Sequence, residues 1–145
     1  EQLLSESGWR TFSRLGGQWT DDLLVSNEQY AIGGVDTVRG YTESQNSGDY
    51  GYFAQVELRS PHWLKNVKSM KDSHAFLFAD GGKVRMVQTN PEEDAKFSIS
   101  SFGAGFSASA WEQLNLMLQW AYPLETQGKV QKGDQRVHFS LAYTF

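Results

Sequence analysis

Three histidines are the side chains in this sequence best suited to acid–base or metal chemistry, since the chain contains no cysteine. An imidazole acts as a general base beside a nucleophile, or as a zinc ligand when further ligands follow at short spacing. These three lie on a predicted turn and on two separate predicted strands, with no Gly-x-Ser-x-Gly elbow nearby. We therefore predict neither a catalytic site nor a metal site, and we expect that the protein is not an enzyme. The three residues are His62, His74 and His138.

Pairs of adjacent glycines are the second feature that could carry chemistry, because glycine-rich loops can hold phosphates. Each pair lacks the Lys-Ser/Thr of a phosphate loop and the strand-to-helix setting that such a loop needs. We interpret the pairs as bends or bulges and expect no cofactor. Lys and Arg are scattered along a chain of net charge −4, so we also expect no nucleic-acid partner. The pairs are Gly16-Gly17, Gly33-Gly34 and Gly81-Gly82.

The composition favours strands over helices. Fourteen glycines and only three prolines accompany five Trp, six Tyr and nine Phe in 145 residues. Aromatic residues favour pleated surfaces, whereas glycine weakens helices. No run of about 18 apolar residues occurs, and the N-terminus has no basic stretch followed by an apolar one, so we expect neither a transmembrane helix nor a signal peptide. A membrane β-barrel is compatible with this composition, because its strands alternate apolar and polar residues.

Six segments alternate apolar and polar residues with a period of two, which predicts strands with one apolar face. In the clearest segment, leucine and aromatic residues occupy every second position from Leu114 to Leu124. In another, the opposite charges of Glu57 and Arg59 lie on the face away from the apolar one. The predicted strands are Trp9–Trp19, Tyr52–Arg59, His74–Val84, Ile99–Trp111, Leu114–Leu124 and Arg136–Phe145.

Strand length and loop length favour a membrane barrel. Most of the segments have about 10 residues or more, enough to cross a bilayer obliquely and longer than the usual strand of a globular domain. Long polar loops alternate with short links, as in barrels. A soluble antiparallel sandwich is the alternative, and six strands alone cannot enclose a channel. The predicted long loops are Thr20–Gly48, Gln88–Phe97 and Thr126–Gln135, and the short links are Ser60–Ser73 and Glu112–Gln113.

A series of motifs is more specific than this alternation. Residues 28–41 read EQYAIGGVDTVRGY, and GDYG at 48–51, ELRSP at 57–61 and FADGG at 78–82 follow in that order. The series resembles the ShlB/FhaC/HecB haemolysin secretion and activation family. In that family a segment E-Q-[FY]-x-[IL]-G-G-x-x-[ST]-V-R-G-[FY] precedes G-D-x-G, E-L-x-x-P and F-x-D-x-G. The resemblance covers nearly the whole chain.

The resemblance implies an all-β fold, an antiparallel transmembrane β-barrel of sixteen strands whose last six are the strands predicted here. Residues 1–145 would then form the C-terminal part of the barrel, preceded by ten more strands and two periplasmic POTRA domains. The loop at residues 20–49 would fold back into the lumen, where Arg39 would meet Asp80 in a charge-assisted latch. The implied loop latch is Val38, Arg39, Gly40 and Tyr41, and the implied partner motif on the barrel wall is Phe78, Asp80 and Gly82.

The last predicted strand alternates up to a C-terminal phenylalanine. This pattern resembles the signal that bacterial assembly machinery recognises in outer-membrane barrels, and it indicates the outer membrane of a Gram-negative bacterium. The outward side chains would face lipid, because the strand must pair with the first strand to remove the sheet edge. The residues of this assembly signal are Val137, Phe139, Leu141, Tyr143 and Phe145.

The function implied by the resemblance is two-partner secretion. The protein would translocate a partner exoprotein, of the haemolysin or adhesin type, from the periplasm to the cell surface without nucleotide hydrolysis. Its other expected partners are outer-membrane lipid and the barrel-assembly machinery. A barrel-assembly factor of the same superfamily is the alternative, because it shares the V-R-G-[FY] loop, and a passive pore is a second alternative.

Overall fold

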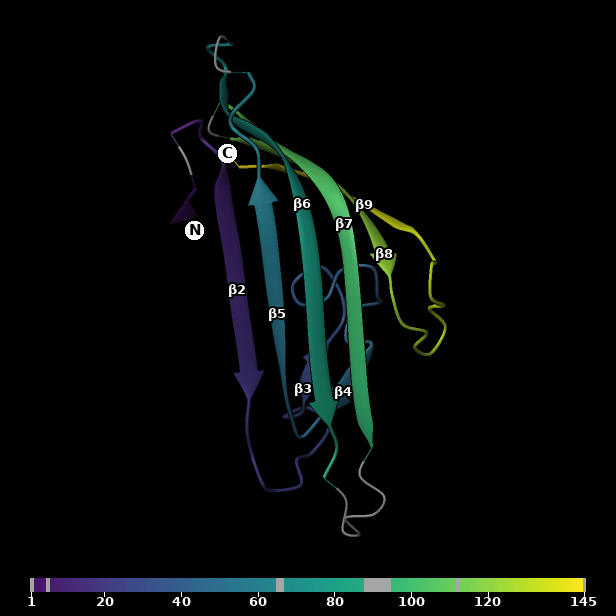
Figure 1. The fold of residues 1–145 in the computed structure, drawn as a ribbon. Helices are drawn as coiled ribbons and strands as arrows, with labels where there is room; N and C mark the ends of the chain where they lie inside the picture. Colours follow the sequence, from purple (N-terminus) through teal and green to yellow (C-terminus); the bar gives the residue numbers. More distant parts are fainter. Residues whose placement is uncertain (1, 5, 65–66, 88–94, 112, 145) are drawn as a thin grey trace.

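Figure 1 shows the computed structural model as one curved antiparallel sheet with a small hairpin on its concave side. The structure describes residues 2–4, 6–64, 67–87, 95–111 and 113–144. All regular elements in these ranges are strands, and none of the described residues forms a helix long and apolar enough to cross a membrane. The strands are β1 (Gln2–Leu3), β2 (Arg10–Gln18), β3 (Tyr30–Ile32), β4 (Asn46–Gly48), β5 (Tyr50–Arg59), β6 (Met70–Arg85), β7 (Lys96–Ala110), β8 (Leu114–Pro123) and β9 (Arg136–Tyr143).

The large sheet is an up-and-down meander with the order β1-β2-β5-β6-β7-β8-β9. Its six long strands coincide with the six segments whose alternation predicted them, and every pair of neighbours is antiparallel. The all-β antiparallel prediction is confirmed. Strands β6 and β7 have 16 and 15 residues and are longer than predicted. Within the described residues β1 and β9 do not pair with each other, so the closed sixteen-stranded barrel stays a prediction.

The segment predicted as the polar loop Thr20–Gly48 contains a short hairpin of its own. Strands β3 and β4 pair with each other and contact β5 and β6 on the concave side, as Figure 1 shows. Apolar residues of this loop pack with inward residues of the wall, and with one residue of the β8–β9 connection, into one buried cluster. The members are Ile32, Val38, Tyr41, Phe53, Val84, Ile99 and Val130. The loop therefore has a buried apolar core. The sequence did not predict this core, because the loop has too few apolar residues to form a recognisable alternating pattern.

The sheet is apolar on the outside and partly polar on the inside. Leu15, Leu77 and Phe139 are 79%, 60% and 63% exposed on the convex face. Gln55, Glu57 and other polar side chains are buried on the concave face beneath the loop. A sandwich would cover its apolar face with a second sheet, but the second sheet here lies on the other side. Among the described residues the sandwich alternative therefore finds no support, and the distribution is that of a barrel wall.

Glycines on the concave face of β7 make room for aromatic rings of β6. A Cβ added at Gly103 would overlap the carbonyl oxygen of Trp120 and lie 2.5 Å from Cζ of Phe78. Gly105 makes the same kind of room for the ring of Phe76. Because these rings fill the space that side chains on β7 would occupy, close packing explains why the inward residues of this strand are small.

This packing predicts that Gly103→Ala destabilises the wall, at a cost of about 2 kcal/mol, because backbone and ring atoms must both move. Gly81→Ala on β6 is the matched control, since the nearest heavy atom to its added Cβ lies 3.9 Å away. The measurement is the heat-modifiable, folded fraction of the full-length protein in the outer membrane. Equal folded fractions for the two variants would contradict the packing argument.

Candidate functional site

Arg39 of the loop forms a two-pronged ion pair with Asp80 on the inner wall of β6. Its Nε and Nη2 atoms donate to the two carboxylate oxygens of Asp80 at 2.6 and 2.7 Å, and its backbone N–H donates to Oδ2 at 3.1 Å. Both residues are buried, with exposed fractions of 4% and 5%. A fork of this kind fixes direction as well as distance, so it holds the loop in one orientation.

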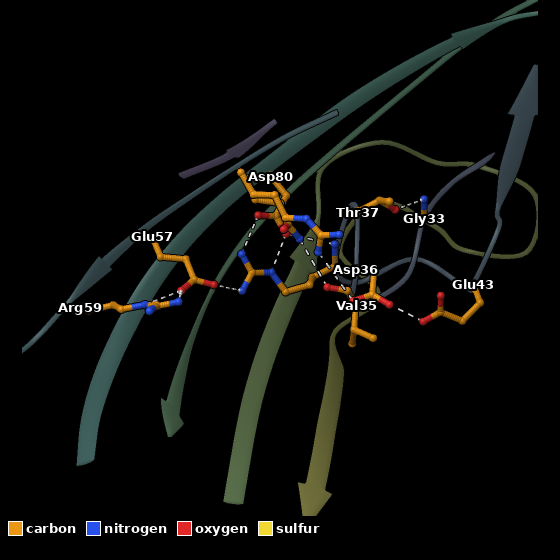
Figure 2. Close-up of polar contacts among 11 residues, drawn as sticks. Gly33, Val35, Asp36, Thr37, Glu43, Glu57, Arg59 and Asp80 are labelled. Carbon is orange, nitrogen blue, oxygen red and sulfur yellow. Dashed lines mark hydrogen bonds and ion pairs between the residues drawn. The ribbon is translucent and has the colours of Figure 1, made fainter. Parts of the chain in front are cut away.

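Glu57 on β5 completes the charge balance of the site. Its Oε1 accepts a hydrogen bond of 2.6 Å from Nη1 of Arg39. Its Oε2 accepts a hydrogen bond of 2.9 Å from Nε of Arg59 and forms an ion pair with Nη2 of Arg59 at 2.7 Å. Figure 2 shows Glu57 beside Arg59, with Asp80 on the neighbouring strand. Two guanidinium groups thus face two carboxylates, and the cluster is neutral. Neutrality matters because an unpaired buried charge is costly.

The ring of Phe78 supports the guanidinium of Arg39 from below. The Cζ atom of Arg39 lies 3.7 Å from the ring centroid, which is the geometry of a cation–π contact. Two residues on from Asp80, a Cβ added at Gly82 would lie 3.1 Å from Cγ2 of Val38. Phe78, Asp80 and Gly82 point inward from one strand because their spacing is two. The wall motif therefore gives the loop three contacts: the ring of Phe78 and the carboxylate of Asp80 bind Arg39, and Gly82 leaves room for Val38.

The other half of the loop motif contacts the next strands. Gly40 has a positive φ of 89°, and its added Cβ would lie 3.2 Å from Ala121 on β8. Glycine adopts this conformation without steric cost. The hydroxyl of Tyr41 lies 3.0 Å from the carbonyl oxygens of both Ser100 and Glu125, and it accepts a bond from the N–H of Glu125. Burial raises the pKa of Tyr41 to about 12, so the phenol keeps its proton at physiological pH.

The Gly-Asp-Tyr-Gly motif at residues 48–51 ties the two ends of the loop together. The carboxylate of Asp49 accepts hydrogen bonds from the N–H groups of Leu24 and Val87, at 2.9 and 2.6 Å. Burial pushes the pKa of Asp49 upward, but these bonds outweigh it and leave that pKa below its ordinary value. At Gly48 and Gly51, an added Cβ would lie 2.6 and 2.5 Å from carbonyl oxygens of β6. Both glycines are thus required by close approach of the backbones.

The remaining predicted site residues lie apart from the loop. Side chains of β9 stand on the convex face with exposed fractions of 56% to 66%, and these are Val137, Phe139, Leu141 and Tyr143. Phe145, the last member of the predicted assembly signal, lies outside the described residues. Among the residues that the structure describes, no group of three His, Cys, Asp or Glu side chains could hold a metal ion.

Sequence reasoning did not assign two partners of the loop. Glu57 appears in the sequence as a polar residue of a strand and as the start of a motif, but its contact with Arg39 joins residues 18 positions apart. Glu125, which also accepts from the N–H and hydroxyl of Ser100, anchors the segment after β8 beside Tyr41. The alternation already placed the carboxylate of Glu57 on the polar face of its strand. Because an unpaired buried charge is unfavourable, this position could have indicated a cationic partner.

The fold and the site together define a class of protein. A curved antiparallel meander with an apolar convex face, and a loop held against its concave face by buried charges, is consistent with the wall of an outer-membrane β-barrel. The chain belongs to the haemolysin secretion/activation family ShlB/FhaC/HecB, whose family model matches residues 2–108. Its compartment is the outer membrane of a Gram-negative bacterium.

One curated relative and the solved structures complete the comparison. The chain is 30% identical over 118 residues to the outer membrane transporter CdiB of Dickeya dadantii (strain 3937). The match covers 75% of this chain and 19% of that protein, so the chain corresponds to about a fifth of the relative. No solved structure matches the chain significantly.

The charge balance predicts that Glu57→Gln loosens the loop although Arg39 and Asp80 stay in place. The substitution leaves two guanidinium groups facing one carboxylate, and loss of bonds to a charged group costs about 2 kcal/mol. The measurement is the urea midpoint of unfolding of the full-length protein in lipid vesicles. Glu28→Gln is the control, because it makes the same chemical change at an exposed loop position. Equal midpoints for both variants would contradict a role for Glu57 in the cluster.

Proposed function

We propose that this chain forms the wall and the gate region of an outer-membrane transporter for two-partner secretion. The transporter moves an unfolded partner exoprotein, of the haemolysin or adhesin type, from the periplasm to the cell surface without nucleotide hydrolysis. The single observation that carries the proposal is the buried network of Arg39, Asp80 and Glu57, which holds loop 20–49 on the concave wall. Membership of a secretion and activation family supports it.

In a closed barrel the concave face is the lumen, so the loop stands in the path of the substrate. The chain then supplies the last six strands of a sixteen-stranded barrel, and periplasmic POTRA domains of the complete protein recognise the exoprotein. The path opens through a conformational change of the loop and of the pairing between the first and last strands of the barrel. The free energy for transport comes from folding of the exoprotein outside the cell.

The network sets a limit on how the loop moves. Breaking the fork while both charges stay buried would cost several kcal/mol, whereas the exposed pair between Arg14 and Asp36, at 3.8 Å, contributes little. The loop tip near Asp36 is therefore the part that yields first, and the anchor at Arg39 stays in place. The tip is held mainly by contacts within the loop, such as the bond of 3.1 Å from the N–H of Val35 to Oε1 of Glu43. Its bond to the wall, from Gln55 to the carbonyl of Val35, is long at 3.4 Å.

A barrel-assembly factor of the same superfamily is the alternative function, and it would use the same loop. Two features favour secretion. The Gly48-Asp49-Tyr50-Gly51 and Glu57-Leu58-Arg59-Ser60-Pro61 motifs follow the pattern of the secretion family, and the curated relative carries the name of a transporter. A passive pore would need a closed barrel but no buried anchor for a loop.

In the complete protein, Arg39→Ala and Asp80→Ala should each lower export of the partner, and the double variant should lose no more than the worse single variant. The reason is that each change removes the same ion pair. The measurement is exoprotein in the medium divided by folded barrel in the membrane. Asp36→Ala is the control, because it removes an exposed charge from the same loop and should leave export near the wild-type level. Independent, additive losses would rule out the latch.

Phe145 should act in assembly rather than in the transport path. We expect deletion of Phe145 from the complete protein to lower the amount of heat-modifiable barrel, because the terminal aromatic residue is part of the proposed assembly signal. Barrels that do insert should export partner at a near-normal rate each. A normal amount of folded barrel with reduced export per barrel would assign the terminal strand to the gate instead.

A further inference from the structure

The convex face carries an apolar groove near the end of the sheet where β5 and β6 are joined by a turn. Its volume is about 210 Å³, and its lining includes Leu58, Leu77, Ala75 and Ala104 from three adjacent strands. The hollow exists because the small side chains of Ala75 and Ala104 lie between larger outward residues. Two tryptophans, Trp9 and Trp63, also line it, and they are 41% and 61% exposed.

Tryptophans mark the two edges of the apolar band. Trp9 and Trp19 flank the nine residues of β2, and the ten residue steps from one to the other span about 33 Å along a strand. At the usual tilt of barrel strands this corresponds to a band of about 25 Å, the height of the apolar band of outer-membrane barrels. Trp63 and the groove therefore lie at the membrane interface on the side of Trp9. This is the periplasmic interface in the orientation of the proposed function, on which the inference rests, because the long segment between β2 and β5 leaves the sheet at the opposite end and long loops face the cell exterior.

The turn before β6 is built to hold apolar residues against the convex face. The backbone N–H of Trp63 donates to the carbonyl of Ser73 at 3.1 Å, and the N–H of Leu64 donates to Oγ of Ser73 at 3.1 Å. The indole of Trp63 lies against Phe106, with ring centroids 6.3 Å apart. Trp63, Leu64 and Val67 are all exposed. Three exposed apolar side chains in one short turn indicate contact with lipid rather than with water.

Two exposed lysines lie in the same segment, between Trp63 and Ala75 of the groove lining. Lys71 lies two residues before Ser73 on β6, and Lys68 lies in the turn. Lysines at an interface extend their charged ends to the phosphate level while their stems remain in the apolar region. We propose that this groove binds one glycerophospholipid of the periplasmic leaflet, with an acyl chain over Ala75 and Ala104 and the phosphate near Lys68 and Lys71.

The test uses the full-length protein, washed free of lipid in detergent and titrated with dioleoylphosphatidylglycerol while native mass spectrometry counts bound lipids. Ala75→Leu fills the groove, and we expect at least about tenfold less of the singly bound state at equal lipid concentration. Ala79→Leu is the matched control, because it makes the same change on the same outward face of β6, four residues along. That control should bind like the wild type.

A second comparison examines the phosphate. Dioleoylglycerol has the same chains without phosphate, and we expect it to bind the wild type more weakly than the phospholipid. Lys71→Ala should reduce that difference. Equal binding by Ala75→Leu and Ala79→Leu would overturn the proposal and leave only a general lipid annulus. A dimer mass that Ala75→Leu removes would overturn it in favour of a second copy of the chain. Because the readout is bound lipid, either result leaves the export test of Arg39 and Asp80 unaffected.

Discussion

The ion pair between Arg39 and Asp80 is the interaction on which the rest of the site depends. A guanidinium buried to this degree is stable only where every prong has an acceptor, and here Asp80 takes two prongs and Glu57 the third. That requirement fixes the register of β5 against β6, since Glu57 stands opposite Phe78 and Gln55 opposite Asp80. A slip of β5 by one residue would turn Glu57 to the apolar face and leave Asp80 where it is.

Around this pair, glycines in the wall leave space for neighbouring side chains. Gly82 leaves room for Val38, and Gly103 leaves room for the ring of Phe78, on which the guanidinium lies. The loop can approach the sheet closely only because the wall has no side chains at these positions. The buried ion pair thus fixes the orientation of the loop, and the glycines allow the loop to lie close to the sheet. Both charges of the pair are buried, and the lower dielectric of a buried site strengthens their attraction.

Much of this arrangement could be predicted from the sequence. Alternation with a period of two located the six long strands, because the convex face of the sheet is apolar and the concave face is partly polar. Resemblance to a family singled out Arg39 and Asp80, which the structure brings together. The hairpin of β3 and β4 was not predicted, since strands of three residues are too short for periodicity. The roles of Glu57 and Glu125 depend on contacts between distant positions, which no local pattern contains. The groove beside Trp63 was not predicted either, because it depends on the relative sizes of neighbouring side chains on three adjacent strands.

The central claim is that the loop lies against the wall in the living outer membrane, held there by the buried charges. The 145 residues contain no cysteine, so a pair introduced as Val38→Cys and Gly82→Cys can report this directly. A Cβ at Gly82 would lie 3.1 Å from Cγ2 of Val38, within reach of a disulfide. The measurement is the oxidised fraction of the complete protein in intact cells, with Val38→Cys and Gly81→Cys as the control, because Gly81 lies on the opposite face. We expect efficient cross-linking of the first pair and little of the second. Equal, low cross-linking of both pairs in folded barrels would contradict the account.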